Sequence, residues 1–174
     1  MPPRLRKFML TLHVMSSVGL LGAIAAFFAL AIAGLIAGLG AGDAQTIRAA
    51  YPAMQLITRL VVVPLAIGSL LTGLIQSLGT PWGLFRHYWI VVKLLLTVFA
   101  VTILLLKIAL IDHAAHLASE AILPDTALRA AGLQLAVHAA GGLCLLLVPL
   151  MLSIYKPHGT TRYGWRKQFE QLSQ

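Results

Sequence analysis

Charged residues are scarce in this sequence, and acidic residues are the scarcest of all. Charged residues make up 10% of the 174 residues, whereas a typical soluble domain has roughly 25%. Five residues are acidic and thirteen are Lys or Arg, so the formal net charge is +8. Hydrophobic residues account for 59% of the chain. A soluble protein of this size could not bury so much apolar surface, so the composition predicts an integral membrane protein.

Cysteine is nearly absent, and this excludes several functional classes. Cys144 is the single cysteine, so an intrachain disulfide and a Cys-x-x-Cys redox or zinc motif are ruled out. The basic residues flank apolar runs and do not form a stripe with interleaved aromatic residues, so we expect no nucleic-acid partner. No nucleophile–base pair or carboxylate dyad stands out either. A hydrolase therefore has little support, and whether the chain is an enzyme stays open.

Four apolar runs are long enough to cross a bilayer, which takes roughly 20 helical residues. They cover residues 8–39, 53–78, 88–111 and 130–155. Backbone groups in lipid must be satisfied within the spanning segment, and the runs lack the alternating pattern of barrel strands. We therefore predict an all-α, four-helix membrane bundle, forming one domain over residues 1–174 with a basic tail at 156–174.

The basic residues predict the orientation of this bundle. Lys and Arg concentrate in cytoplasmic loops, and four spans place most of the basic residues on one side. Four of the five acids fall on the other side. We therefore expect both termini in the cytoplasm, a location in the bacterial inner membrane, and contact of the basic face with anionic lipids. The basic residues that we assign to the cytoplasmic side are Arg4, Arg6, Lys7, Arg86, Lys156, Arg162, Arg166 and Lys167.

Each predicted helix carries one polar stripe at helical spacing. An ionisable side chain that faces lipid costs several kcal/mol, so we expect the stripes to face a shared interior. A rise of about 1.5 Å per residue sorts the stripes into two layers. The layer nearer the cytoplasm holds His13, Lys93 and Gln76, and the other holds Arg59, His138, Gln134, His113 and His116.

These residue types suit a haem-binding bundle. Histidine is a common haem ligand, and a buried cation can neutralise a haem propionate. We therefore predict a haem-b protein of the oxidoreductase or electron-transfer type, with His13 and His138 as candidate axial ligands. Because these two lie at different depths, each would need another partner. Arg59 and Lys93 would hold propionates or handle protons, although Lys93 could instead extend to the membrane surface.

Two other functions fit the same residues. Asp112, His113 and His116 have a spacing that can bind copper or zinc from one helix face, which would give a periplasm-facing protein that handles these metals, although such residues at an aqueous helix end are often only solvated. A bundle without a cofactor could instead act as a scaffold, a partner subunit or a small-solute pathway, because small residues and a few polar contacts suffice for helix packing. Assembly with a second copy or with a membrane partner also stays open.

Three short motifs carry a resemblance to a known group. The first helix has Leu12-His13-Val14, and the third has Trp89 followed by 93–96 (KLLL). The second helix contributes Arg59, Pro64, Gly68 and Gly73. Over its first two-thirds the chain resembles small bacterial membrane proteins that include the DUF2269-type proteins, the CopD-like copper-resistance domains and the haem-containing membrane protoporphyrinogen oxidases.

The resemblance implies a compact four- or five-helix bundle, with haem b in the protoporphyrinogen oxidase branch. In that branch the early histidine is implicated in haem ligation and the lysine of the third helix is a hallmark, which corresponds here to His13 and Lys93. The chain departs from the branch after His13, where MSSVGLLGAIAAFFAL replaces an aromatic-rich stretch. The end of the third run, KIALIDHAAH, is only loosely similar. These departures put porphyrinogen oxidation in doubt and leave the bundle and its haem as expectations.

Overall fold

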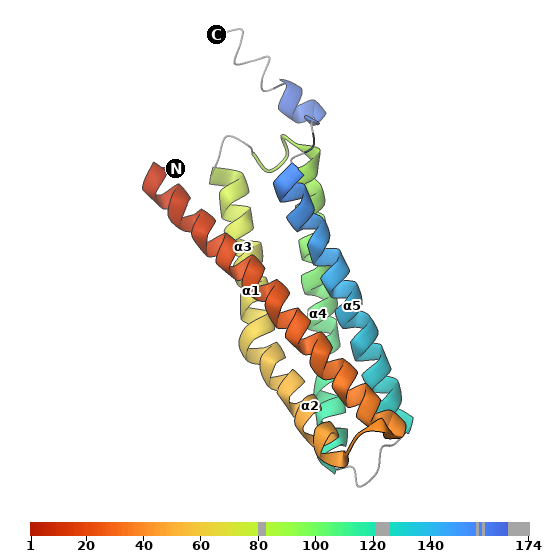
Figure 1. Cartoon of the computed structure of the whole chain (residues 1–174). Helices are drawn as coiled ribbons and strands as arrows, with labels where there is room; N and C mark the ends of the chain where they lie inside the picture. Colours follow the sequence, from red (N-terminus) through yellow and green to blue (C-terminus); the bar gives the residue numbers. More distant parts are fainter. Residues whose placement is uncertain (80–82, 121–125, 156, 158, 167–174) are drawn as a thin grey trace.

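The computed structural model describes residues 1–79, 83–120, 126–155, 157 and 159–166, which form four long helical rods (Figure 1). The first rod is α1, and the second consists of α2, a π-helical turn and α3. The third and fourth rods are α4 and α5. The helices are α1 (Pro3–Ile36), α2 (Ala44–Ile57), α3 (Val63–Gly79), α4 (Tyr88–Glu120) and α5 (Thr126–Tyr155), with π-helical turns at Ala37–Ala41 and Thr58–Val62.

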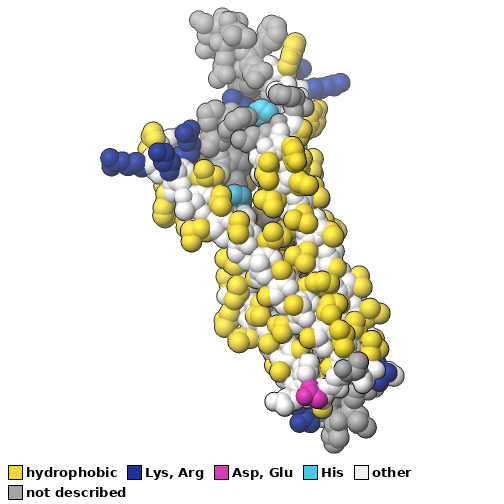
Figure 2. Space-filling view, in the orientation of Figure 1, with side chains coloured by type: hydrophobic (Ala, Val, Ile, Leu, Met, Phe, Trp, Pro, Cys, Tyr) yellow, Lys and Arg dark blue, Asp and Glu magenta, His cyan; other side chains and the backbone are white. Residues whose placement is uncertain are grey.

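All four rods are long and apolar enough to cross a membrane, so the chain is a membrane helix bundle, as the composition predicted. Hydrophobic side chains cover the flank of the bundle in Figure 2, and charged side chains gather towards its two ends. The start of α1 and the end of α5 lie at the same end of the bundle, together with the end of α3 (Figure 1). We call this the terminal end, and the opposite end the distal end.

The helices continue beyond the apolar runs that predicted them. The second rod begins at Ala44, α4 extends to Glu120 and α5 begins at Thr126. The segments predicted as distal loops are therefore largely helical. Hydropathy identifies only the part of a helix that lies in hydrocarbon, whereas these extensions are stabilised by packing against one another. Ala114 and Ala118, for example, are completely buried in α4.

The π-helical turn in the second rod explains how the rod continues past Pro64. Proline lacks an N–H, and its ring clashes with the carbonyl four residues earlier in a regular α-helix. Here the Val63 N–H donates to the Thr58 carbonyl, which widens the turn just before Pro64. The expected disturbance at Pro64 therefore takes the form of a wide turn that carries Arg59. Turns of this kind often occur at functional sites.

A buried tyrosine joins three helices in the distal half. Tyr51 of α2 is 1% exposed. A Cβ on Gly34 of α1 would lie 3.0 Å from its ring, and a Cβ on Gly132 of α5 would overlap its hydroxyl oxygen. The two glycines thus provide the space that the ring occupies. Around Tyr51 lies the larger apolar core, which includes Met54 and Leu128.

A smaller apolar layer crosses the middle of the bundle. Leu20, Val62 and Ala66 are buried there, and partly buried side chains from α4 and α5 pack against them. Beyond this layer, towards the terminal end, the described helices bury few side chains. In α1, α3, α4 and α5 these are Ser16, Ser69 and Ile90. The terminal half therefore buries fewer side chains than the distal half, and two of these three are polar.

Candidate functional site

His13 occupies the seam between α1 and α3 in the terminal half. Its Nδ1 lies 3.1 Å from the carbonyl oxygen of Ser69 and 3.1 Å from the hydroxyl oxygen of Thr72. A carbonyl can only accept, so Nδ1 carries the proton and donates it. The Thr72 hydroxyl donates its own proton to the Gly68 carbonyl at 2.6 Å, so it too can accept from His13. The neutral ring consequently keeps its lone pair on Nε2.

Gly73 allows the imidazole ring to lie against the α3 backbone. A Cβ at this position would be 2.9 Å from Cε1 of His13 and 3.7 Å from Nε2. Any larger residue would therefore displace the ring from this position. The hydrogen bond to the Ser69 carbonyl and the contact with the backbone at Gly73 therefore fix the orientation of the ring.

Further polar contacts tie α1 to α3 around His13. The hydroxyls of Ser17 and Ser69 are 2.7 Å apart. One turn before His13, the Met9 carbonyl accepts a hydrogen bond from Nε2 of Gln76 at 2.7 Å. Polar contacts of this type hold helices together where lipid gives no hydrophobic driving force. Gln76 therefore fixes the seam and does not bond the His13 ring.

Lys93 faces the same half of the bundle from α4. Its ammonium donates to the Ser153 hydroxyl of α5 at 2.7 Å and lies 5.4 Å from the ring centroid of Trp89. Ser153 in turn donates to the Pro149 carbonyl at 2.8 Å, so it accepts from Lys93. His13 and Lys93 thus both lie in the terminal half, but each bonds other residues, His13 those of α3 and Lys93 that of α5.

Arg59 is not part of a shared interior cluster. Its Nη2 pairs with Oδ2 of Asp112 at 2.7 Å, and Gln55 donates to Oδ1 of the same carboxylate at 2.8 Å. The side chains of Arg59 and Asp112 are 58% and 30% exposed. The expectation that Arg59 faces inward is therefore wrong, because the wide turn directs it along the outside of the rod to the α4 carboxylate.

Two histidines of the predicted second layer, His138 and His116, contact residues of their own helices. The Nδ1 of His138 donates to the Gln134 carbonyl of its own helix at 2.6 Å, which again leaves the lone pair on Nε2. His116 lies 3.4 Å from Glu120, with both side chains 68% exposed, and His113 is also exposed. The second layer is therefore a set of separate local contacts.

His13 and His138 cannot share one metal ion. Gly142 packs beside Ile24 of α1, and Ile24 is roughly 16 Å along the helix from His13 at 1.5 Å per residue. His138 lies one turn further towards the distal end. This agrees with the expectation that the two histidines belong to different depths.

Asp112, His113 and His116 do not form a metal-binding group. Within the parts of the chain that the structure describes, no three His, Cys, Asp or Glu side chains are arranged to hold a metal ion. Asp112 points to Arg59 and Gln55, and His116 to Glu120. Helical spacing placed the three residues near one another, but it could not show that other side chains compete for them.

Comparison with known proteins adds no further information about this site. No protein family, curated protein or solved structure matches the chain significantly.

Proposed function

We propose that this chain is a haem-b-binding membrane protein of the electron-transfer or oxidoreductase type, with His13 as an axial ligand. The observation that carries the proposal is the His13 ring, whose Nδ1 is held by the Ser69 carbonyl at 3.1 Å while Nε2 keeps a lone pair. Histidines that bind metals usually donate their other ring nitrogen to a carbonyl or carboxylate in this way. The bond fixes both the tautomer and the direction of the free nitrogen.

The surroundings of His13 also suit this group. Gly73 leaves the ring close to the backbone, and the described helices bury few other side chains in the terminal half. Lys93 supplies a positive charge on the opposite side, where it would neutralise a propionate. A bound haem would supply one-electron exchange between ferric and ferrous iron. Arg59 is already paired with Asp112 and has no part in this proposal.

We further propose that the terminal end faces the cytoplasm and that the membrane is the bacterial inner membrane. Arg4, Arg6 and Lys7 lie in the first turns of α1, and Arg86 lies just before α4 at the same end. Positively charged residues of this kind are retained on the cytoplasmic side. Labelling tests this orientation. Single cysteines are placed at each end of a variant in which Cys144 is replaced, and a reagent that does not cross the membrane is added to intact cells that produce it.

Visible spectroscopy tests the haem proposal. The wild-type protein, produced with ample haem and purified in a mild detergent, should show a Soret band that shifts when dithionite is added. The His13→Ala variant should lose this band, whereas His113→Ala, at an exposed distal position, should keep it. A wild-type protein without a Soret band, or an unchanged band in His13→Ala, would rule out His13 as a haem ligand.

A second candidate is a cofactor-free bundle that acts as a scaffold or partner subunit. The observation in its favour is that the polar side chains of the terminal half already bond one another, as in the pairs Ser17–Ser69 and Lys93–Ser153. Under this function His13 would serve only to hold α1 against α3. A colourless protein that copurifies with one membrane partner, in His13→Ala as in the wild type, would support it.

A further inference from the structure

The segment that follows α5 folds back onto the start of α4. The Thr161 N–H donates to the Arg86 carbonyl at 2.9 Å, and the Tyr88 N–H donates to the Gly159 carbonyl at 3.4 Å. The Thr161 hydroxyl also donates to the Phe85 carbonyl. We call the described part of this segment, residues 157 and 159–166, the hook. It is held by backbone contacts between parts of the chain about 75 residues apart.

The hook is fitted closely to the residues beneath it. Gly164 is buried, and a Cβ at this position would overlap the Arg86 carbonyl. The Gly164 N–H donates to the Thr161 hydroxyl oxygen at 3.1 Å. The hook therefore has a defined shape and gives its side chains a defined arrangement.

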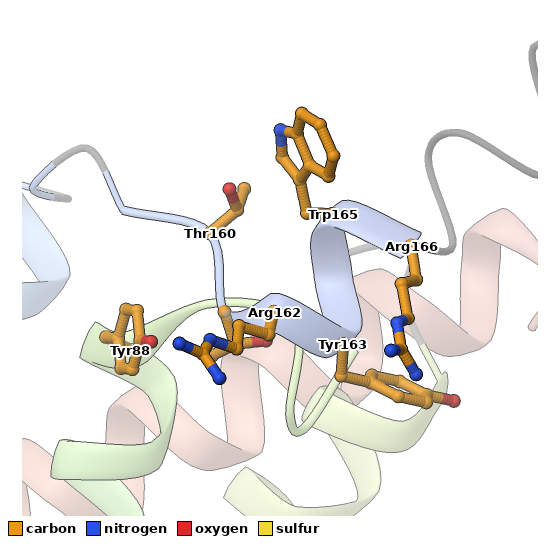
Figure 3. A pocket seen from close by; sticks show the side chains of 7 residues that line it. Tyr88, Thr160, Arg162, Tyr163, Trp165 and Arg166 are labelled. Atoms are coloured by element: carbon orange, nitrogen blue, oxygen red, sulfur yellow. The ribbon is translucent and has the colours of Figure 1, made fainter.

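A depression of about 690 Å³ lies between the hook and the first turn of α4 (Figure 3). Figure 3 shows the Arg162 guanidinium directed towards Tyr88, whereas the Arg166 side chain lies on the other side of the short helix, away from Tyr88. The lining residues offer hydrogen-bond donors and positive charge, and none of those that the structure describes is acidic. Besides Arg162 and Arg166, they include Tyr88, Thr160, Tyr163 and Trp165.

The chemistry of the lining points to a phosphate group. Arginine has a planar fork of donors that matches the oxygens of a phosphate, and hydroxyl groups add further donors. The depression also lies at the level where α4 begins, and Tyr and Trp side chains prefer the boundary between hydrocarbon and water. A lipid headgroup is therefore the phosphate group that we expect at this depression.

We propose that the hook and the start of α4 form a binding site for the phosphate-bearing headgroup of an anionic phospholipid. Arg162 binds the phosphate beside Tyr88, and Arg166 adds positive charge to the same surface. The Tyr88 ring packs beside the glycerol and the upper part of the acyl chains. The proposal deepens the proposed membrane placement of the terminal end and does not depend on the haem. Because the depression is lined by both the hook and Tyr88, a bound lipid would also hold the hook against α4.

Lipid binding in detergent tests this site without any assumption about orientation. Native mass spectrometry of the purified protein, titrated with phosphatidylglycerol or phosphatidylcholine, gives the number and affinity of bound lipids. The wild type should bind one phosphatidylglycerol in preference to phosphatidylcholine. Loss of two charged hydrogen-bond donors should weaken this binding by more than about tenfold in Arg162→Gln/Arg166→Gln.

The matched control is Arg4→Gln/Arg6→Gln, which removes the same charge from the terminal end outside the depression. It should leave the affinity for phosphatidylglycerol within about twofold, because non-specific attraction to a membrane surface is absent in a neutral detergent. Equal losses in both double variants, or equal binding of the two lipids by the wild type, would overturn the proposal.

Two further measurements separate the alternatives. Displacement of phosphatidylglycerol by millimolar inorganic phosphate would show a site for a small soluble phosphate and would overturn the assignment to lipid; no displacement supports it. Thr161→Val removes the hydroxyl contacts of the hook without changing its charge and should also weaken lipid binding. The visible spectrum of each sample is recorded in parallel, so a missing haem and a missing lipid site are distinguished.

Discussion

Replacement of Gly73 by alanine should disturb His13 without unfolding the bundle. The new Cβ would lie 2.9 Å from Cε1 of the ring, whereas carbon atoms in contact are about 3.5–4.0 Å apart. The ring must therefore retreat by about 0.6–1 Å. Its bond to the Ser69 carbonyl, now 3.1 Å, would then exceed about 3.5 Å, which is too long for a hydrogen bond.

The effect on stability should be small because two contributions oppose each other. Losing the hydrogen bond costs about 1 kcal/mol, whereas alanine in place of glycine stabilises a helix interior by about 0.5–1 kcal/mol. Gly22→Ala is the matched control, because a Cβ there meets nothing within 4 Å. Gly22→Ala should gain the stabilisation of the helix interior and should not lose a hydrogen bond.

Thermal unfolding in detergent, followed by far-ultraviolet circular dichroism, measures this difference. Gly73→Ala should be less stable than Gly22→Ala by about 1 kcal/mol, and its haem content should fall while that of Gly22→Ala stays at the wild-type level. If both variants were stabilised equally and kept the same haem content, the close fit of His13 to Gly73 would be refuted.

Two further predictions concern the distal half. Gly132→Ala should destabilise the bundle by about 1–3 kcal/mol, because its Cβ would overlap the Tyr51 hydroxyl and the core has no room to adjust. Gly141→Ala on the same helix, with open space around it, should not, and equal melting temperatures would contradict the packing of Tyr51. Asp43 accepts hydrogen bonds from Thr46, which hold the pKa of its carboxyl below its ordinary value of 3.8. The folded state is therefore stabilised while this carboxyl is ionised, and that contribution is lost as the pH falls through the lowered pKa. Asp43→Ala should lack this part of the acid sensitivity, whereas parallel loss of stability in both proteins would show that the cap contributes nothing.

The sequence predicted the four rods because hydrocarbon thickness sets a minimum length for an apolar helix. It could not predict where they end, since the distal extensions combine buried alanines such as Ala114 with exposed polar residues such as His113. Neither hydropathy nor charge separates such a mixture from a loop. The large distal core therefore became visible only in three dimensions.

The candidate site was predicted unevenly for a similar reason. The seam that contains His13 follows from helical spacing, because residues three and four apart share a face. Spacing does not give the rotation of one helix against another, so it could not show that Arg59 reaches Asp112. The sequence also could not predict the role of Gly73. A glycine in a helix indicates that another group packs closely against it, but it does not show which group this is. The hook is a further case, because its contacts join distant parts of the chain.

The haem content of His13→Ala and His138→Ala, compared side by side, tests the central claim most directly. Both histidines bond a carbonyl through Nδ1, but only His13 lies in the terminal half, which also contains Lys93. The ratio of haem to protein should therefore fall close to zero in His13→Ala and stay near the wild-type value in His138→Ala. Full haem content in His13→Ala would contradict the assignment of the site to the terminal half.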